Sequence, residues 1–249
     1  MKKAVTVLLA IVLFAQLFSV SVYADYKFAT CIVPEDTDTV DSMIIYFKEY
    51  STYLVSKGKK AKSLFCFADD IAKVIAADNP TSIVISGRYS KNFHTFAEDY
   101  IKKYHITDVT VMGWSAGGND VITTAAELIE AFEDRVPNIL LIDCNHTDGL
   151  SDGLFKSIKE RGSSIWYFLT LACKAKNEAL TKIRKYDIPL NYIRFSVPDD
   201  YMGSKHIACR NAAILFNIAG WIRDGADGFL PDCLSLGYFD YESKAIVLE

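Results

Sequence analysis

A serine between two glycines is the residue of this chain whose setting best suits covalent chemistry. The segment GWSAG at positions 113–117 follows a short apolar stretch, Asp108–Met112, and precedes a stretch with helical spacing, Asp120–Phe132. A strand, a sharp turn and a helix in this order expose the turn residue at the end of the strand. Glycines on both sides let the strand and helix backbones approach closely. The pattern therefore predicts that Ser115 is the nucleophile of an acyl transfer.

Acyl transfer also needs hydrogen-bond donors for the oxyanion that develops on the substrate. The predicted helix begins just behind Ser115, so the backbone N–H of Ala116 can face this charge. A second donor is expected from a loop after an early strand. We favour Arg88, which follows Gly87, because a helix and the strand of the serine come directly after it. Residues 34–37 are the alternative.

The GWSAG segment resembles the nucleophile elbow of the α/β-hydrolase superfamily, and the order of elements from there to Arg223 is similar to that family. The resemblance implies an eight-stranded, mostly parallel sheet. It also implies catalysis by a serine, an acid and a histidine, with the histidine last in the chain. His206 stands after the last of the strands predicted below and before a long helical stretch, where such hydrolases place the base.

An unactivated hydroxyl is a poor nucleophile, so Ser115 needs a general base. His146 and His206 follow the serine, and the resemblance favours His206. His94 and His105 precede the serine and flank a predicted helix, so we interpret them as surface or capping residues.

The acid is less well defined by the sequence than the serine and the base. Asp143 ends the first strand after the serine and is ranked first, because some lipases of this fold carry their acid there. The family more often places the acid after the next strand, where residues 172–178 contain no aspartate and Glu178 ranks second. Asp199 and Asp200, in the loop of His206, rank last. A catalytic dyad of the serine and the histidine, without an acid, is also compatible with the sequence.

Short β-branched or aromatic runs alternate with longer stretches of helical period. This alternation predicts an α/β fold, with a mostly parallel central sheet and helices on both faces, in a single domain. The expected strands are Phe28–Val33, Ser63–Phe67, Ser82–Ser86, Asp108–Met112, Asn138–Ile142, Ser164–Leu171 and Asn191–Val197. The expected helices are Thr39–Ser56, Asp69–Ala77, Phe93–Tyr104, Asp120–Phe132, Gly153–Glu160, Asn177–Lys185 and Ile207–Arg223.

The first residues predict export. Lys2 and Lys3 precede an apolar run, and Ala24 is a small residue at the expected cleavage position, as in a secretory signal peptide. Residues 1–24 are interpreted as this signal and residues 25–249 as the hydrolase-like domain. We expect a secreted protein with no stable membrane association after cleavage.

Charge and cysteine content narrow the possible partners. A formal net charge of -4 and a pI near 5.6 argue against nucleic acid, because no basic face would neutralise phosphates. The six cysteines permit disulfides in an exported chain, but several lie in apolar stretches, so at most one or two bridges are expected. No C-x-x-C spacing occurs, and we expect neither a metal site nor a cofactor.

These observations favour an exported serine hydrolase, a carboxylesterase that acts on a small-molecule ester with Ser115, His206 and Asp143. Only about 20 residues separate Phe132 from the helix near Gly153, which leaves little room for a lid and favours soluble or short-acyl esters. Two alternatives remain open: an exported binding protein on the same fold without catalysis, and an acyltransferase.

Overall fold

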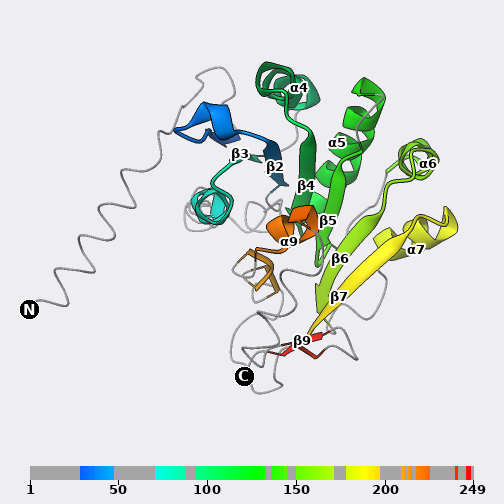
Figure 1. Ribbon diagram of the computed structural model, residues 1–249. Coiled ribbons are helices and arrows are strands. Elements are labelled where there is room, and N and C mark those ends of the chain that lie inside the picture. Colours follow the sequence, from blue (N-terminus) through cyan, green and yellow to red (C-terminus); the bar gives the residue numbers. More distant parts are fainter. Residues whose placement is uncertain are drawn as a thin grey trace, which may run out of the picture.

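The computed structural model describes residues 29–47, 71–87, 93–132, 136–144, 150–170, 178–196, 209–210, 212–214, 217–224, 239–240 and 245–247. Within these ranges one nine-stranded sheet runs through the molecule in the order β1-β3-β2-β4-β5-β6-β7-β9-β8 (Figure 1). Its strands are β1 Ala29–Ile32, β2 Ser42–Phe47, β3 Ser82–Gly87, β4 Asp108–Trp114, β5 Asn138–Ile142, β6 Ile165–Thr170, β7 Leu190–Ser196, β8 Phe239–Asp240 and β9 Ala245–Val247.

The sheet is parallel except at its two edges. Every neighbouring pair from β3 to β9 is parallel, whereas β1 pairs antiparallel with β3 and β8 pairs antiparallel with β9. The carboxyl ends of the parallel strands therefore lie along one edge of the sheet, here called the carboxyl edge, and their amino ends lie along the opposite, amino edge. The prediction of a mostly parallel sheet is confirmed.

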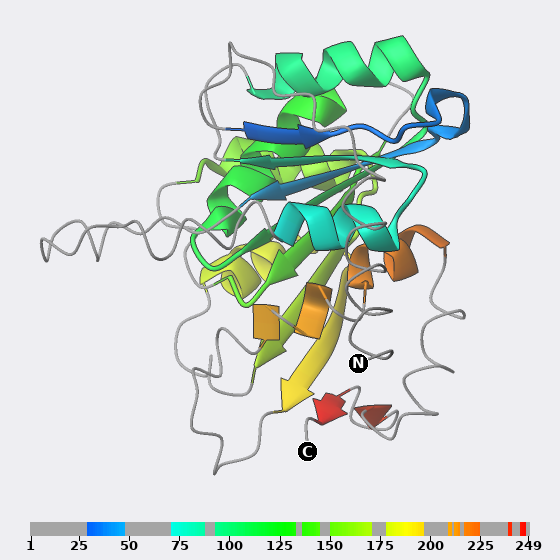
Figure 2. The same ribbon diagram turned by 90° about the vertical axis from the view of Figure 1, so that its left-hand side faces the viewer.

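Helices cover both faces of the sheet, as Figures 1 and 2 show. One core cluster joins the sheet to α4 (Phe93–Tyr104), α5 (Gly117–Ala131), α6 (Asp152–Glu160) and α7 (Glu178–Lys185). The other joins it to residues 71–78, residues 209–214 and α9 (Ile218–Asp224). Side chains along each strand alternate between the two clusters, as in β4, where Val111 belongs to the first cluster and Met112 to the second. The predicted fold class is correct.

The prediction of a helix over Thr39–Ser56 is wrong for its first part, because Ser42–Phe47 forms strand β2. All six residues are buried, since β2 lies between β3 and β4 with helices on both faces. A short run that is apolar on both sides has no period that separates a buried strand from a buried helix. This strand nevertheless decides which loop lies beside the serine.

Other elements depart from expectation more locally. The single helix expected over Ile207–Arg223 is interrupted at Asn217, which has a φ of 46° and directly precedes α9. Helix α5 begins at Gly117, three residues earlier than expected. Strands β8 and β9 were not predicted, and the strand expected at Ser63–Phe67 lies outside the described residues.

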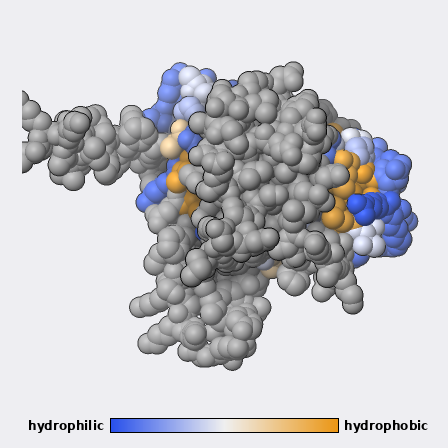
Figure 3. Space-filling model, turned by 90° about the horizontal axis from the view of Figure 1, so that it is seen from below, coloured by the Kyte–Doolittle hydropathy of each residue, from blue (hydrophilic) through white to orange (hydrophobic). Residues whose placement is uncertain are grey.

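Most large apolar side chains of the described residues are shielded from solvent. Among them, the exposed large apolar side chains are Val74 and Val136. Where described atoms are visible from below, Figure 3 shows hydrophilic residues around apolar areas on two sides of the molecule. No helix in the described ranges combines the length and the apolar character needed to cross a membrane.

Candidate active site

Ser115 occupies the turn between β4 and α5 in a backbone conformation that is unusual for serine. Its φ is 57°, in the left-handed region, which costs an L-residue about 1–2 kcal/mol. Two backbone hydrogen bonds hold the turn: the Ser115 N–H donates to the Ile142 carbonyl at 3.1 Å, and the Gly118 N–H donates to the Ser115 carbonyl at 3.3 Å. Strain kept at a turn of this kind is characteristic of functional residues.

Gly113 makes the close approach of strand and helix possible. A Cβ atom on Gly113 would lie 2.7 Å from Cγ2 of Val121 and 3.0 Å from the carbonyl oxygen of Gly117. Both contacts are to α5, so any side chain at this position would push the helix away from β4. The glycine that the motif requires is thus explained by packing.

The amino end of α5 lies directly behind the serine. Ala116 is the N-cap residue of this helix, with φ −67° and ψ −14°, and its side chain provides no capping hydrogen bond. The first N–H groups of a helix have no partner within it, and they carry the positive end of the helix dipole. This end of α5 suits a negative charge that develops beside Ser115.

Asp143 leaves the adjacent strand at the same level as the serine. Trp114 of β4 pairs with Ile142 of β5, so Ser115 and Asp143 are the residues that follow two paired positions. Asp143 also has a left-handed backbone, with a φ of 46°, and its side chain is fully buried. The structure therefore places the acid ranked first by the sequence on the carboxyl edge, next to the turn that presents the serine.

Cys209 and Arg210, which come shortly after His206 in the chain, belong to the packing on the other face of the sheet from α5. The guanidinium of Arg210 lies over the ring of Trp114, with 4.6 Å from Cζ to the ring centroid. The thiol of Cys209 lies 3.8 Å from the carbonyl oxygen of Phe168 in β6. These contacts bring the part of the chain that follows His206 to the carboxyl edge, although His206 itself lies outside the described residues. Nothing in the sequence singles out Arg210, since its role depends on packing.

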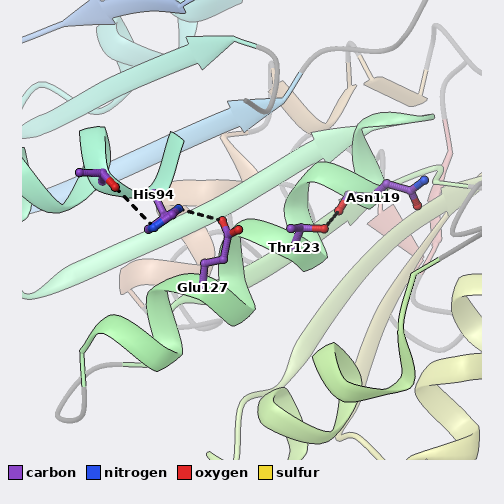
Figure 4. A network of polar contacts seen from close by, with 5 residues as sticks. His94, Asn119, Thr123 and Glu127 are labelled. Atoms are coloured by element: carbon purple, nitrogen blue, oxygen red, sulfur yellow. Dashed lines mark hydrogen bonds and ion pairs between the residues drawn. The ribbon is translucent and has the colours of Figure 1, made fainter. Parts of the chain in front are cut away.

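Two of the four histidines are far from the serine. Nδ1 of His94, in α4, lies 3.3 Å from Oε2 of Glu127, in α5. Figure 4 shows that Glu127 lies well along α5 from Asn119, which belongs to the first turn of this helix. Glu127 is ten residues beyond Gly117, about 15 Å along the helix axis. His105 precedes β4 at the amino edge, about 20 Å of strand away from Ser115. His146 and His206 lie outside the described residues.

The strand order bears on the second oxyanion donor. Residues 34–37 follow the antiparallel strand β1, and Asp41, just beyond them, bonds to Thr81 and Thr107 at the amino edge. That alternative loop therefore lies at the wrong edge of the sheet. Arg88 lies outside the described residues. It follows β3, which is separated from β4 by β2, and β2 ends at Phe47 directly beside Gly113.

The other candidate acids are described only in part. Glu178 is the first residue of α7, and its side chain lies outside the description, as do Asp199 and Asp200. The described ranges contain no group of three or more histidine, cysteine, aspartate or glutamate side chains that could hold a metal ion.

Cys31, Cys144 and Cys209 are buried thiols outside any disulfide. Burial raises the pKa of the Cys31 thiol to about 11, while a hydrogen bond with Tyr100 opposes this rise. Cys31 therefore remains protonated at neutral pH and packs as a small apolar residue, as the sequence predicted. Cys66, Cys173 and Cys233 lie outside the described residues.

Comparisons with known proteins agree with this architecture. No protein-family model matches the chain, and no curated protein matches it. Among solved structures, a serine-to-alanine mutant of esterase Est22 matches with a TM-score of 0.51 and 10% identity, over 90% of each chain. The chain has the α/β-hydrolase fold.

Two further structures are similar at lower scores. Carboxyl esterase 2 from the fungus Tuber melanosporum has a TM-score of 0.48 and 12% identity, over 81% of this chain and 84% of that one. The thioesterase domain SrfTE has a TM-score of 0.45 and 13% identity, over 78% and 96%. At such identities the chemistry has to be argued from the site.

Proposed function

We propose that this protein is an exported serine hydrolase that cleaves carboxylic esters through a covalent acyl-enzyme on Ser115. The observation that carries the proposal is the left-handed backbone of Ser115, at the end of a central parallel strand and at the amino end of α5. This combination presents a hydroxyl at the carboxyl edge, beside N–H groups suited to an oxyanion.

In the proposed reaction, Oγ of Ser115 attacks the ester carbonyl carbon while His206 accepts the hydroxyl proton. The N–H of Ala116 donates a hydrogen bond to the resulting oxyanion. When the tetrahedral intermediate collapses, the bond to the alcohol oxygen breaks and His206 returns the proton to that oxygen. Water, deprotonated by His206, then attacks the acyl carbon. As the bond from this carbon to Oγ of Ser115 breaks, His206 returns the proton to Oγ and the carboxylic acid product leaves.

Asp143 is proposed as the acid that orients the imidazole of His206 and stabilises its protonated form. Its position beside the serine turn supports this role. The remoteness of His94 and His105 from Ser115 supports a base among the remaining histidines, and the order of elements favours His206 over His146.

The second oxyanion donor has two candidates, Arg88 after β3 and the chain directly after β2. The strand order favours the second, because β2 is the direct neighbour of β4 and its last residue, Phe47, pairs with Gly113. Export rests on the basic and apolar character of residues 1–24. The substrate is proposed to be a small ester, and the reaction requires no cofactor.

Labelling with a fluorophosphonate probe tests the proposal, because such probes react with activated serines. We expect the purified protein to be labelled, and we expect labelling to disappear in Ser115→Ala and in His206→Ala. His94→Ala and His105→Ala are matched controls that should label normally.

A folded protein that takes up no probe would contradict the proposed hydrolase and favour a binding protein on this fold. Hydrolysis of p-nitrophenyl esters of increasing acyl length would then define the substrate range of a labelled protein. An added alcohol that captures the acyl group faster than water would identify an acyltransferase.

A further inference from the structure

The backbone of Asp143 is held in a conformation that its surroundings must maintain. A φ of 46° is unfavourable for most L-residues, and Asp143 directly follows strand β5 rather than the carboxyl end of a helix. Conformations of this kind persist where neighbouring contacts over-determine them. The contacts around Asp143 therefore indicate what sets its position.

Hydrogen bonds fix the chain at Asp143 and at the following residue, Cys144. The Asp143 N–H donates to the Phe168 carbonyl at 2.7 Å, which continues the pairing of β5 with β6 by one residue. The Cys144 thiol donates to the Gly113 carbonyl, with Sγ 3.2 Å from the oxygen, and lies 3.4 Å from the Ile142 carbonyl oxygen. The Tyr167 hydroxyl donates to the Cys144 carbonyl.

Together these bonds form a connection across three strands, from Tyr167 in β6, through Cys144 after β5, to Gly113 in β4. The side chains of Tyr167 and Cys144 are 1% and 0% exposed. Buried hydrogen bonds are protected from competition by water, and leaving one partner unsatisfied is costly. The connection therefore ties Asp143 rigidly to the strand that presents Ser115.

We propose that Tyr167 and Cys144 are positioning residues that hold the Asp143 carboxylate in register with the serine turn. This inference rests on the proposed function, with Asp143 as the acid of the triad. An acid that orients an imidazole acts through geometry, and a displacement of about 1 Å at a catalytic group can cost about 100-fold in rate.

The test is Tyr167→Phe, which removes one buried hydroxyl and leaves the ring. With p-nitrophenyl acetate as substrate we expect kcat to fall about tenfold while KM stays unchanged. The acid limb of the kcat/KM profile should also move to lower pH. A displaced carboxylate stabilises the His206 imidazolium less, so the pKa of that histidine falls. A role in stability alone would leave this limb in place.

Two further comparisons control for disruption of the fold. Cys144→Ser keeps a hydrogen-bond donor for the Gly113 carbonyl and should retain most of the activity. Cys144→Ala removes this donor, and its kcat should fall about as much as that of Tyr167→Phe. Tyr100→Phe removes another buried tyrosine hydroxyl, on α4 near Cys31, and should leave kcat and the pH profile unchanged.

A double-mutant cycle with Asp143→Asn decides the matter. If the residues act through Asp143, Tyr167→Phe should have little further effect in the Asp143→Asn protein. An equal loss in both backgrounds, or full activity in Asp143→Asn, would overturn the positioning role. If only the positioning role is wrong, the fluorophosphonate probe would still label Ser115 in the unmodified protein. Absence of this labelling would contradict the proposed function itself.

Discussion

The two edges of the sheet use left-handed backbone conformations for different purposes. At the amino edge, His105, Gly162 and Asp187 have positive φ values of 53°, 71° and 50°, and each stands between a helix and the strand that follows it. At the carboxyl edge, Ser115 and Asp143 have φ values of 57° and 46°, and each directly follows a strand.

The amino-edge residues terminate helices. In each case the next residue donates its N–H to the carbonyl five residues earlier, as in a Schellman motif. The bonds are Ile106 to Ile101 at 3.0 Å, Ser163 to Ile158 at 3.1 Å and Ile188 to Ile183 at 3.1 Å. The left-handed residue after α6 is a glycine, whereas those after α4 and α7 are a histidine and an aspartate. The backbone is what matters at this edge, and the identity of the side chain is secondary.

Neither carboxyl-edge residue follows the carboxyl end of a helix, where a positive φ is common. Their conformations are held by hydrogen bonds to neighbouring strands, as Ser115 is by the Ile142 carbonyl and Asp143 by the Phe168 carbonyl. At the amino edge a left-handed residue ends a helix, whereas at Ser115 and Asp143 hydrogen bonds to neighbouring strands maintain the conformation and fix the direction in which the side chain leaves the backbone.

The largest effect is expected at Ser115, where two substitutions distinguish the contribution of the side chain to catalysis from the strain of the backbone. Both Ser115→Ala and Ser115→Gly should lower kcat by at least about 10³-fold, because each removes the proposed nucleophile. The glycine variant should be about 1 kcal/mol more stable than the alanine variant, since glycine tolerates the left-handed backbone. Esterase assays and urea unfolding measure the two quantities. Equal stability of the two variants would mean that Ser115 carries no strain.

Gly113→Ala tests whether the elbow depends on close packing. We expect its free energy of unfolding to fall by about 2 kcal/mol, because the added methyl group would collide with Val121 and the α5 backbone. Gly153→Ala in α6 is the matched control. Its Cβ would meet Ser151 Oγ at 3.6 Å, an ordinary contact, so this variant should be at least as stable as the original protein.

Arg210→Ala tests whether the elbow is also held from its second face. Loss of the guanidinium over Trp114 should lower stability by about 1 kcal/mol. Arg210→Lys keeps the positive charge without the planar stacking group and should recover part of this loss. Thermal unfolding of the three proteins measures the effect, and no difference among them would show that the ring contact contributes little.

The smallest effect is expected at the amino edge. His105→Gly should raise stability by up to about 1 kcal/mol and leave the proposed esterase activity unchanged, because His105 is exposed and lies at the end of α4. His105→Ala removes the same side chain but keeps the left-handed strain, so it should bring no gain. A loss of activity in His105→Gly would break the distinction between the two edges.

Much of the fold was predictable because the strands and helices of an α/β protein differ in their apolar period. Strands β3, β4 and β5 and helix α4 were predicted within two residues of their observed ends. Strand β2 was mistaken for a helix, because its burial on both faces removes the alternation that reveals a strand. The break at Asn217 also escaped prediction, since its amide side chain is held by Asn79, 138 residues away.

The sequence by itself determined that a serine would stand between a strand and a helix, because glycine spacing and apolar period are local properties of the chain. It also ranked Asp143 first among the acids. Only the tertiary structure decided that β2 separates β3 from β4, that Asp143 emerges beside Ser115, and that Tyr167, Cys144 and Arg210 contact this region. Strand order and side-chain contacts join residues far apart in the chain, and no local pattern encodes those pairings.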